Sequence, residues 1–171
     1  MVAQRCLGAV VLICLCAGCN PFAPAFDNSP DASLSILGDP RTIDGIFQNL
    51  QYSYTFRDTT IYGQVMNGNY TYVYRDYDLG ADISWGRDED LRITNNLFQN
   101  VERLDLIWNN IVTMTVDSTS TQANVSRNFT LTVTFNANDI ETADGYVTLS
   151  LARPQSTLPW QIVYWRDESN Y

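Results

Sequence analysis

Apolar residues recur at helical spacing where the folded region is expected to begin. Five of them share one helix face, and they are Ile43, Ile46, Phe47, Leu50 and Tyr54. Asp39 is expected to cap this helix, and Pro40 suits its first position, where the missing N–H does no harm. The pattern predicts a long amphipathic helix that ends near residues 57–58.

A short helix and an aromatic strand are expected next. Asp58 is well placed to cap a helix over 59–65, and the Asn-Gly pair at 67–68 indicates a turn. Aromatic and β-branched residues then fill 70–74, a composition typical of a strand. The region 76–85 is expected to form a loop or a short strand.

Gly86 is expected to cap a third helix, whose first turn holds acids that oppose the helix dipole, namely Asp88, Glu89 and Asp90. The chain then reads as four strands, over 104–116, 125–135, 146–152 and 160–166, with turns at 117–124 and at Asp144-Gly145. Helices come early and antiparallel strands late. This order predicts an α+β fold in which a curved, mostly antiparallel sheet is covered by the first and third helices.

The N-terminal segment has the pattern of an export signal. Arg5 precedes an apolar run over 7–15, which is too short to span a bilayer. The following residues, Leu15-Cys16-Ala17-Gly18-Cys19, resemble the lipobox of bacterial lipoproteins. This resemblance implies a signal peptide over 1–18, cleavage after Gly18 and diacylation of Cys19. The alternative is an uncleaved membrane anchor, and both interpretations place the rest of the chain outside the cytoplasm.

The positions of the cysteines and the net charge characterise the mature chain. All four cysteines lie within the first nineteen residues, so the mature chain has no pair for an intrachain disulfide. Residues 19–38, rich in Pro, Ser, Asp and Asn, are expected to be a flexible tether to a domain over 39–171. The mature chain has a formal charge of -10, so we expect acyl chains rather than surface charge to hold it on the membrane. Asn20 after the lipid cysteine favours the outer membrane, with the domain facing the periplasm.

Composition also excludes several kinds of chemistry. The 171 residues include no His and no Lys, which excludes Ser-His-Asp and Cys-His catalysis, histidine metal ligands and lysine Schiff bases. The acidic balance argues against nucleic acid as a partner, since that binding needs clustered cations. We expect no cofactor and no metal.

The whole domain resembles the nuclear transport factor 2-like superfamily. The matching segments are the opening helix 42–56 with Arg57-Asp58 after it, the strand 70–74, Trp85-Gly86-Arg87 opening a helix, and the last strand 160–167. The superfamily has a cone-shaped α+β fold and includes ketosteroid isomerases, polyketide cyclases and scytalone dehydratases. The resemblance implies a pocket between the concave sheet and the first helix, and it leaves the reaction open, because this fold hosts enzymes and binders alike.

Candidate site residues follow from the enzymes of that group, which place tyrosines and carboxylates in an apolar cone. Tyr54 would be a hydroxyl donor, or else an ordinary core tyrosine. Asp58 or Asp76 would be a base, or else a helix cap and a solvated loop residue respectively. Candidates for lining a ligand pocket, or else for ordinary packing, are Tyr54, Tyr70, Tyr72, Tyr74 and Trp108.

The leading functional hypothesis is a membrane-anchored, non-catalytic domain that binds a small apolar ligand or another protein. The alternative is an isomerase- or dehydratase-like enzyme that uses Tyr and Asp, which requires a carboxylate deep in the cone within about 3 Å of a tyrosine hydroxyl or a substrate atom. A third hypothesis is a homodimer through the sheet, in which the odd positions of 129–135 face a partner. An open aromatic cavity favours binding, and a closed dry core favours assembly.

Overall fold

The computed structural model describes residues 36–170, and within this range three helices accompany six strands. The helices are α2 (Ile43–Phe56), α3 (Thr59–Val65) and α4 (Arg87–Asn100). The strands are β1 (Met66–Asp76), β2 (Ala81–Gly86), β3 (Arg103–Val116), β4 (Gln122–Asn136), β5 (Asp139–Ala152) and β6 (Gln161–Asn170). The early helices and late strands follow the order that the sequence predicts, with 81–86 as the short strand.

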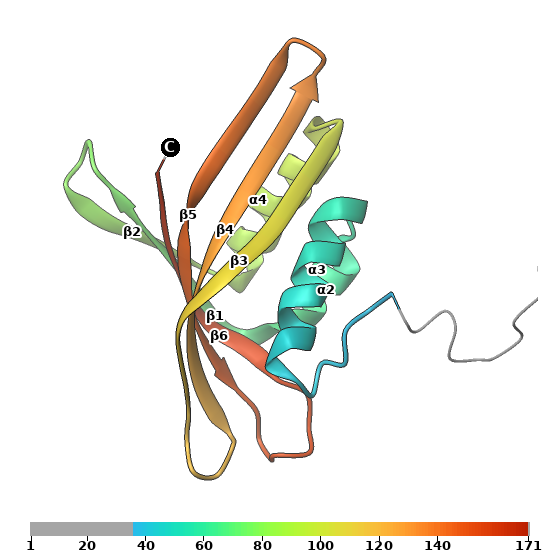
Figure 1. Cartoon of the computed structure of the whole chain (residues 1–171). Helices are drawn as coiled ribbons and strands as arrows, with labels where there is room; N and C mark the ends of the chain where they lie inside the picture. The colour runs from blue at the N-terminus through green and yellow to red at the C-terminus, as the bar shows by residue number, and fades with distance from the viewer. Residues whose placement is uncertain (1–35, 171) are drawn as a thin grey trace, which may run out of the picture. The chain divides into compact units, whose positions relative to one another are not determined.

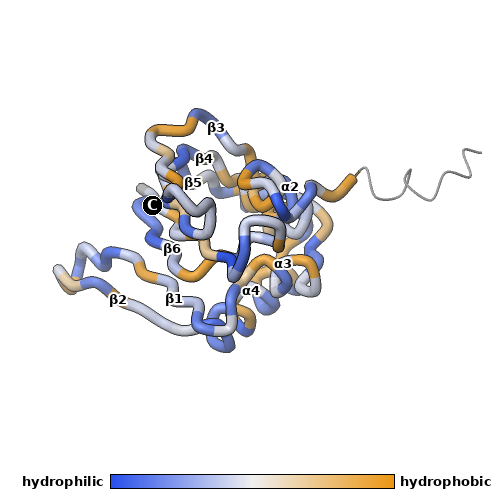
Figure 2. The backbone as a smooth tube through the Cα atoms, turned by 90° about the horizontal axis from the view of Figure 1, so that it is seen from below, coloured by the Kyte–Doolittle hydropathy of each residue, from blue (hydrophilic) through white to orange (hydrophobic). Residues whose placement is uncertain are grey.

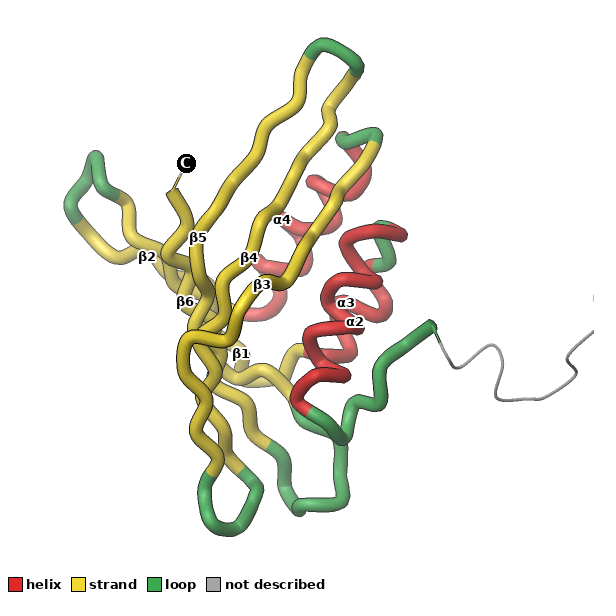
Figure 3. The backbone as a smooth tube through the Cα atoms, viewed as in Figure 1, coloured by secondary structure: helices red, strands yellow, loops and turns green. Residues whose placement is uncertain are grey.

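The strands form one curved sheet in the order β2-β1-β6-β5-β4-β3 (Figure 1). β1 pairs with β6 in parallel, and every other neighbouring pair is antiparallel. The long β3–β4 and β4–β5 hairpins turn at opposite ends of the sheet (Figure 3). The prediction of an α+β fold with a mostly antiparallel sheet is therefore confirmed.

The main core lies between α2 and the concave face of the sheet. Ile46, Phe47 and Leu50 are almost completely buried, as the helical spacing predicts. They belong to one apolar cluster with Val125 and Leu149 of the central strands. Each such buried side chain contributes roughly 1.5–3 kcal/mol relative to exposure. Seen from below, all three helices lie on the same side of the curved sheet (Figure 2).

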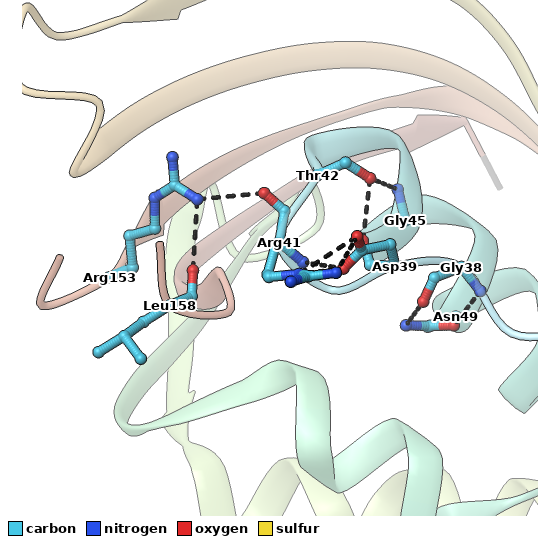
Figure 4. A network of polar contacts seen from close by, with 8 residues as sticks. All are labelled: Gly38, Asp39, Arg41, Thr42, Gly45, Asn49, Arg153 and Leu158. Carbon is cyan, nitrogen blue, oxygen red and sulfur yellow. Dashed lines mark hydrogen bonds and ion pairs between the residues drawn. The ribbon is translucent and has the colours of Figure 1, made fainter. Parts of the chain in front are cut away.

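The start of α2 corrects the predicted cap. Thr42 is the N-cap, and its hydroxyl accepts a hydrogen bond of 3.0 Å from the Gly45 N–H (Figure 4). The Asp39 carboxylate instead binds the Arg41 guanidinium two residues later, with a shortest distance of 2.9 Å. Pro40 lies before the helix, so it does not occupy the first helical position. Because Arg41 occupies the carboxylate of Asp39, the Thr42 hydroxyl, which itself donates to the Asp39 carbonyl oxygen at 2.9 Å, caps the helix.

Two predicted turns are also wrong. Asn67 and Gly68 lie inside β1, and Asp144 and Gly145 lie inside β5, whose hairpin turn comes earlier, at 137–138. Gly145 serves a different purpose, because a Cβ atom there would lie 2.4 Å from Cα of Ser169 on β6. The glycine permits a close approach between two paired strands, which is the other common use of glycine in a sheet.

The alternation predicted for 125–135 is confirmed for Val125, Phe129, Leu131 and Val133, which turn toward the helices, whereas Phe135 is 37% exposed. Phe129 is buried with Trp108 in the main core, and Leu131 packs against the same cluster. These side chains are therefore not available to a partner on the outer face, as the dimer hypothesis would require. Pairing through other parts of the sheet stays a prediction.

The predicted signal peptide over 1–18, the lipid attachment at Cys19 and most of the tether lie outside the described residues. Residues 36–38 of the tether are described, and there Gly38 exchanges two hydrogen bonds with the Asn49 side chain of α2 (Figure 4). No helix in the described range is both long and apolar enough to cross a membrane.

Candidate functional site

A cavity of about 690 Å³ lies between α4, the end of α2 and the concave side of the sheet. This volume is within the range of small-molecule sites. Five of its lining residues are aromatic, and they are Tyr54, Tyr62, Tyr72, Trp85 and Trp165. A smaller chamber of about 60 Å³ shares Tyr54 and Trp165 with it and adds Trp108 and Phe129. The cone is thus closed by packed side chains between α2 and the sheet, and it holds an aromatic cavity on the side of α4.

Asp90 is the most deeply placed acid of this cavity, at 4% exposure. It lies one turn into α4, and Asp90, Thr94 and Phe98 are the three buried residues of that helix. Spacings of four residues place all three on one face, which is turned to the interior. Both carboxyl oxygens accept hydrogen bonds, at 2.7 Å from the Tyr62 hydroxyl and at 2.9 Å from Nε1 of Trp85.

The surroundings of Asp90 perturb its protonation. Burial raises the pKa of Asp90, while the hydrogen bonds from Trp85 and Tyr62 partly oppose the rise. Burial likewise holds the pKa of Tyr62 well above its usual range, so its hydroxyl stays protonated and remains a donor. A buried carboxyl group with a raised pKa at the wall of a cavity is a candidate for binding or for acid–base chemistry.

A second acid, Asp167 of β6, lies on the sheet side of the same cavity at 9% exposure. Its Oδ2 accepts a hydrogen bond of 2.8 Å from the Tyr72 hydroxyl, and its Oδ1 accepts one of 2.9 Å from the Ser169 N–H. Asp167 is two residues from Trp165, so the pleat of β6 directs both side chains to the same face. A third acid, Glu141, lines the cavity as an exposed residue.

The aromatic wall is built by register across three strands. Tyr72 of β1 pairs with Trp85 of β2 on one side and with Trp165 of β6 on the other. The Tyr72 and Trp85 rings stack with centroids 4.5 Å apart and planes 18° apart, and the Trp165 ring lies 6.2 Å from Tyr72. Side chains opposite each other on paired strands lie on the same face, so the three rings form one surface.

The predicted pocket residues are only partly brought together. Tyr54 and Tyr72 line the large cavity, and Trp108 lines the smaller chamber and donates its indole N–H to the Phe47 carbonyl at 2.8 Å. Tyr70 is buried in the core, where burial raises the pKa of its hydroxyl. No described residue forms a hydrogen bond of good geometry with this hydroxyl. The Tyr62 hydroxyl nevertheless lies close to it and partly opposes the rise in its pKa. Tyr74 packs beside Trp85 outside the lining.

Neither predicted base enters the cavity. Asp58 caps α3 by accepting the Thr60 and Ile61 N–H groups at 2.8 and 3.0 Å. Asp76 accepts the Leu79 N–H at 2.8 Å in the turn after β1. Asp58 is therefore a helix cap and Asp76 a turn residue, which are the structural alternatives to a catalytic base. The acids of the cavity are Asp90, Asp167 and Glu141 instead, and the spacing of Asp90 from Phe98 and of Asp167 from Trp165 is the signal that would have identified two of them.

A second hollow, of about 580 Å³, lies where residues 37–41 meet α2, α3 and the segment 159–161. Three of its polar side chains are already used within the protein: Asn49 binds the backbone of Gly38, and Asp39 binds Arg41 (Figure 4). The aromatic cavity is therefore the better candidate site.

Comparison with known proteins supports the fold alone. No family model and no curated protein matches the sequence, whereas many solved structures match the fold. A conserved protein from Planctomyces limnophilus has a TM-score of 0.64 and 12% identity over 75% of this chain and 93% of its own. A proposed scytalone dehydratase from Novosphingobium aromaticivorans has a TM-score of 0.64 and 11% identity over 77% and 83%. A nuclear transport factor 2-like superfamily protein from Salmonella enterica has a TM-score of 0.60 and 13% identity over 82% and 94%. The chain therefore has the cone-shaped fold of the nuclear transport factor 2-like proteins.

Proposed function

We propose that the domain binds a small organic molecule in the aromatic cavity of the cone. The observation that supports this function is the open volume of about 690 Å³, walled by five aromatic side chains and by two buried acids. Protein interiors are packed nearly as densely as crystals of small molecules, and large voids are rare in them. A hollow of this size with convergent polar groups is typical of a ligand site.

Filling the cavity tests this function. Ala143 of β5 lines it, so Ala143→Phe would occupy the space with an aromatic ring, which a strand accommodates well. Ile140 lies on the same strand, is exposed and is not part of the lining, so Ile140→Phe is the matched control. The full-length chain in mild detergent would be titrated with 2-naphthol by calorimetry. We expect saturable binding to the wild type and to Ile140→Phe but not to Ala143→Phe, and saturable binding of equal strength to all three proteins would contradict the function.

Acid–base catalysis in the same cavity is a second candidate function, and the Asp90–Tyr62 pair favours it. The enzyme hypothesis requires a carboxylate deep in the cone within about 3 Å of a tyrosine hydroxyl, and Asp90 lies 2.7 Å from that of Tyr62. The raised pKa of Asp90 also suits proton transfer. However, both oxygens of Asp90 are engaged by donors, so a substrate would have to displace one of them, and binding alone ranks first.

Exchange of carbon-bound protons tests the catalytic candidate. In deuterated buffer, NMR would follow loss of the α-protons of 2-tetralone, a bicyclic ketone. Enzymatic enolisation predicts faster exchange with the wild type and only the background rate with Asp90→Asn. An unchanged background rate with the wild type, in the presence of measured binding, leaves a binder rather than an isomerase.

We also propose that the domain is carried on the periplasmic side of a bacterial membrane by lipid on Cys19. The support comes from the sequence of residues 1–19, which has a basic start, a short apolar run and a lipobox-like end. Two or more acyl chains are needed for stable anchoring, because each buried methylene contributes about 0.8 kcal/mol.

A further inference from the structure

The cavity of the cone has a one-sided charge. Three of its lining residues are acids, namely Asp90, Glu141 and Asp167, and no arginine occurs among the lining residues, all of which belong to the described range. The chain has no lysine or histidine to supply the missing positive charge. An anionic ligand would therefore meet carboxyl groups without any counter-charge, which disfavours it strongly in a partly desolvated site.

Among the three acids, Asp90 lacks a compensating positive charge most clearly, because it is buried and its hydrogen-bond partners are neutral. Its two hydrogen-bond donors are the Tyr62 hydroxyl and the Trp85 indole N–H. Within residues 36–169 it forms no ion pair, whereas exposed acids such as Asp82 and Glu89 pair with arginines. A buried carboxylate without a positive partner is unfavourable, and a cation placed beside it removes that penalty.

The walls of the cavity suit a positive charge as well. Tyr72, Trp85 and Trp165 form one aromatic surface, and Tyr54 and Tyr62 belong to the same lining. The faces of such rings are electron-rich and attract ammonium groups, and several rings around a carboxylate are the usual recognition site of alkylated ammonium ions.

We propose that the cavity selects an organic cation, an alkylated ammonium compound whose apolar body rests on the aromatic wall and whose positive charge lies near Asp90. This inference rests on the proposed binding function and adds the charge class of the ligand. Alkyl groups on the nitrogen favour the site over a bare ammonium ion, since they bury apolar surface against the rings while the charge remains diffuse and weakly hydrated.

A pair of probes with equal shape and different charge tests the proposal. Benzyltrimethylammonium and neopentylbenzene differ in the replacement of the quaternary nitrogen by carbon, and each would be titrated into the full-length chain in the same detergent by calorimetry. We expect the cation to bind at least about tenfold more tightly than the neutral isostere, the size of preference that cation–π contacts and one nearby carboxylate supply. Equal affinity, or tighter binding of neopentylbenzene, would overturn the proposal.

Single substitutions test which acid of the cavity produces the preference for the cation. Asp90→Asn should reduce the ratio of the two affinities to near one, and Glu141→Gln should reduce it less because Glu141 is exposed. Asp88→Asn is the matched control, because it removes the same charge from an exposed position on the same helix and outside this cavity. Circular dichroism checks that each variant is folded, and an Asp90→Asn ratio equal to that of the wild type would also overturn the proposal.

The binding function and the selection of a cation can be contradicted separately. If 2-naphthol and neopentylbenzene bind the wild type and not Ala143→Phe, while the cation has no advantage, the binding function stands and the charge selection is wrong. If no probe distinguishes the wild type from Ala143→Phe, both are wrong. Binding of the cation alone, abolished by Ala143→Phe, supports both.

Discussion

The Tyr62 hydroxyl and Oδ2 of Asp90 lie 2.7 Å apart and join α3 to α4 inside the cone. Both residues are almost completely buried, so the pair is shielded from solvent. The phenol donates to a carboxyl group whose other oxygen accepts the Trp85 indole N–H. This arrangement fixes two helices and one strand around a single acid, and its energetics can be measured from either side of the bond.

Tyr62→Phe should destabilise the fold by about 1–3 kcal/mol, the usual penalty for leaving a buried acceptor without its donor. The change removes one hydroxyl oxygen and preserves the ring, which packs near Tyr54 and Phe98. Urea denaturation followed by tryptophan fluorescence measures the difference in unfolding free energy. Tyr77→Phe is the control, because Tyr77 is highly exposed in the β1–β2 turn and its loss of a hydroxyl should change little. A Tyr62→Phe protein as stable as the control would show that the hydrogen bond contributes nothing net.

Asp90→Asn should stabilise the folded protein at neutral pH, by about 1.4 kcal/mol for each unit by which burial raises the pKa of Asp90. Burial raises the pKa of Asp90 in the folded state, so the folded protein holds this proton more tightly than the unfolded chain does. The wild type therefore gains stability as the pH falls through the folded-state pKa, and the gain is complete below the unfolded-state value near 3.8. Asparagine is neutral at every pH; its amide oxygen can still accept the Trp85 indole N–H, and its NH2 group can donate to the Tyr62 hydroxyl oxygen, which then accepts instead of donating.

The measurement is the unfolding temperature of both proteins across pH 4–8. The advantage of Asp90→Asn should be greatest at the alkaline end of the range and should shrink toward pH 4. If Asp90→Asn raises the unfolding temperature equally at every pH, burial of the ionised Asp90 carboxylate is not what destabilises the wild type. A variant less stable than the wild type at pH 8 would mean that the two hydrogen bonds outweigh the desolvation of Asp90.

Gly145→Ala should destabilise the protein by roughly 1–3 kcal/mol, as overpacking in a well-packed interior does. The added Cβ would lie 2.4 Å from Cα of Ser169 and 2.8 Å from the Glu168 carbonyl oxygen, both backbone atoms that a side-chain rotation cannot move. Gly68→Ala in β1 is the matched control, because a Cβ there meets no atom within 4 Å. Thermal unfolding of the two variants should differ by several degrees, and equal unfolding temperatures would indicate that β5 and β6 separate without strain.

These residues also mark what the sequence can and cannot predict. Helical spacing correctly identified the buried face of α2 through Ile46, Phe47 and Leu50, since that signal depends only on local periodicity. Gly145 was interpreted as a turn residue because tight turns and close approaches of paired strands both favour glycine in the local sequence. Only the pairing of β5 with β6, a contact distant in sequence, distinguishes them.

The site was less predictable than the fold for a related reason. From the sequence, Asp90 was predicted only as a charge that opposes the helix dipole, although its spacing also places it on the same helix face as the buried Phe98. Asp167 lies just past the strand predicted to end at 166, so its alternation with Trp165 was not followed far enough. Tyr54 was proposed from the superfamily resemblance and Tyr72 from its place on an aromatic strand face, and both line the cavity.

Cys19→Ala should abolish lipid attachment, whereas Cys14→Ala should leave it unchanged. Both changes remove one thiol from the same short segment, and only Cys19 follows the predicted cleavage point after Gly18. Each full-length chain would be expressed in a bacterial host with radiolabelled palmitate and separated into soluble and membrane fractions. We expect label on the wild type and on Cys14→Ala but not on Cys19→Ala, which should also retain its first eighteen residues and migrate as a larger species. Label on Cys19→Ala would place the lipid elsewhere, and an unlabelled wild type with an intact N-terminus would favour the uncleaved anchor.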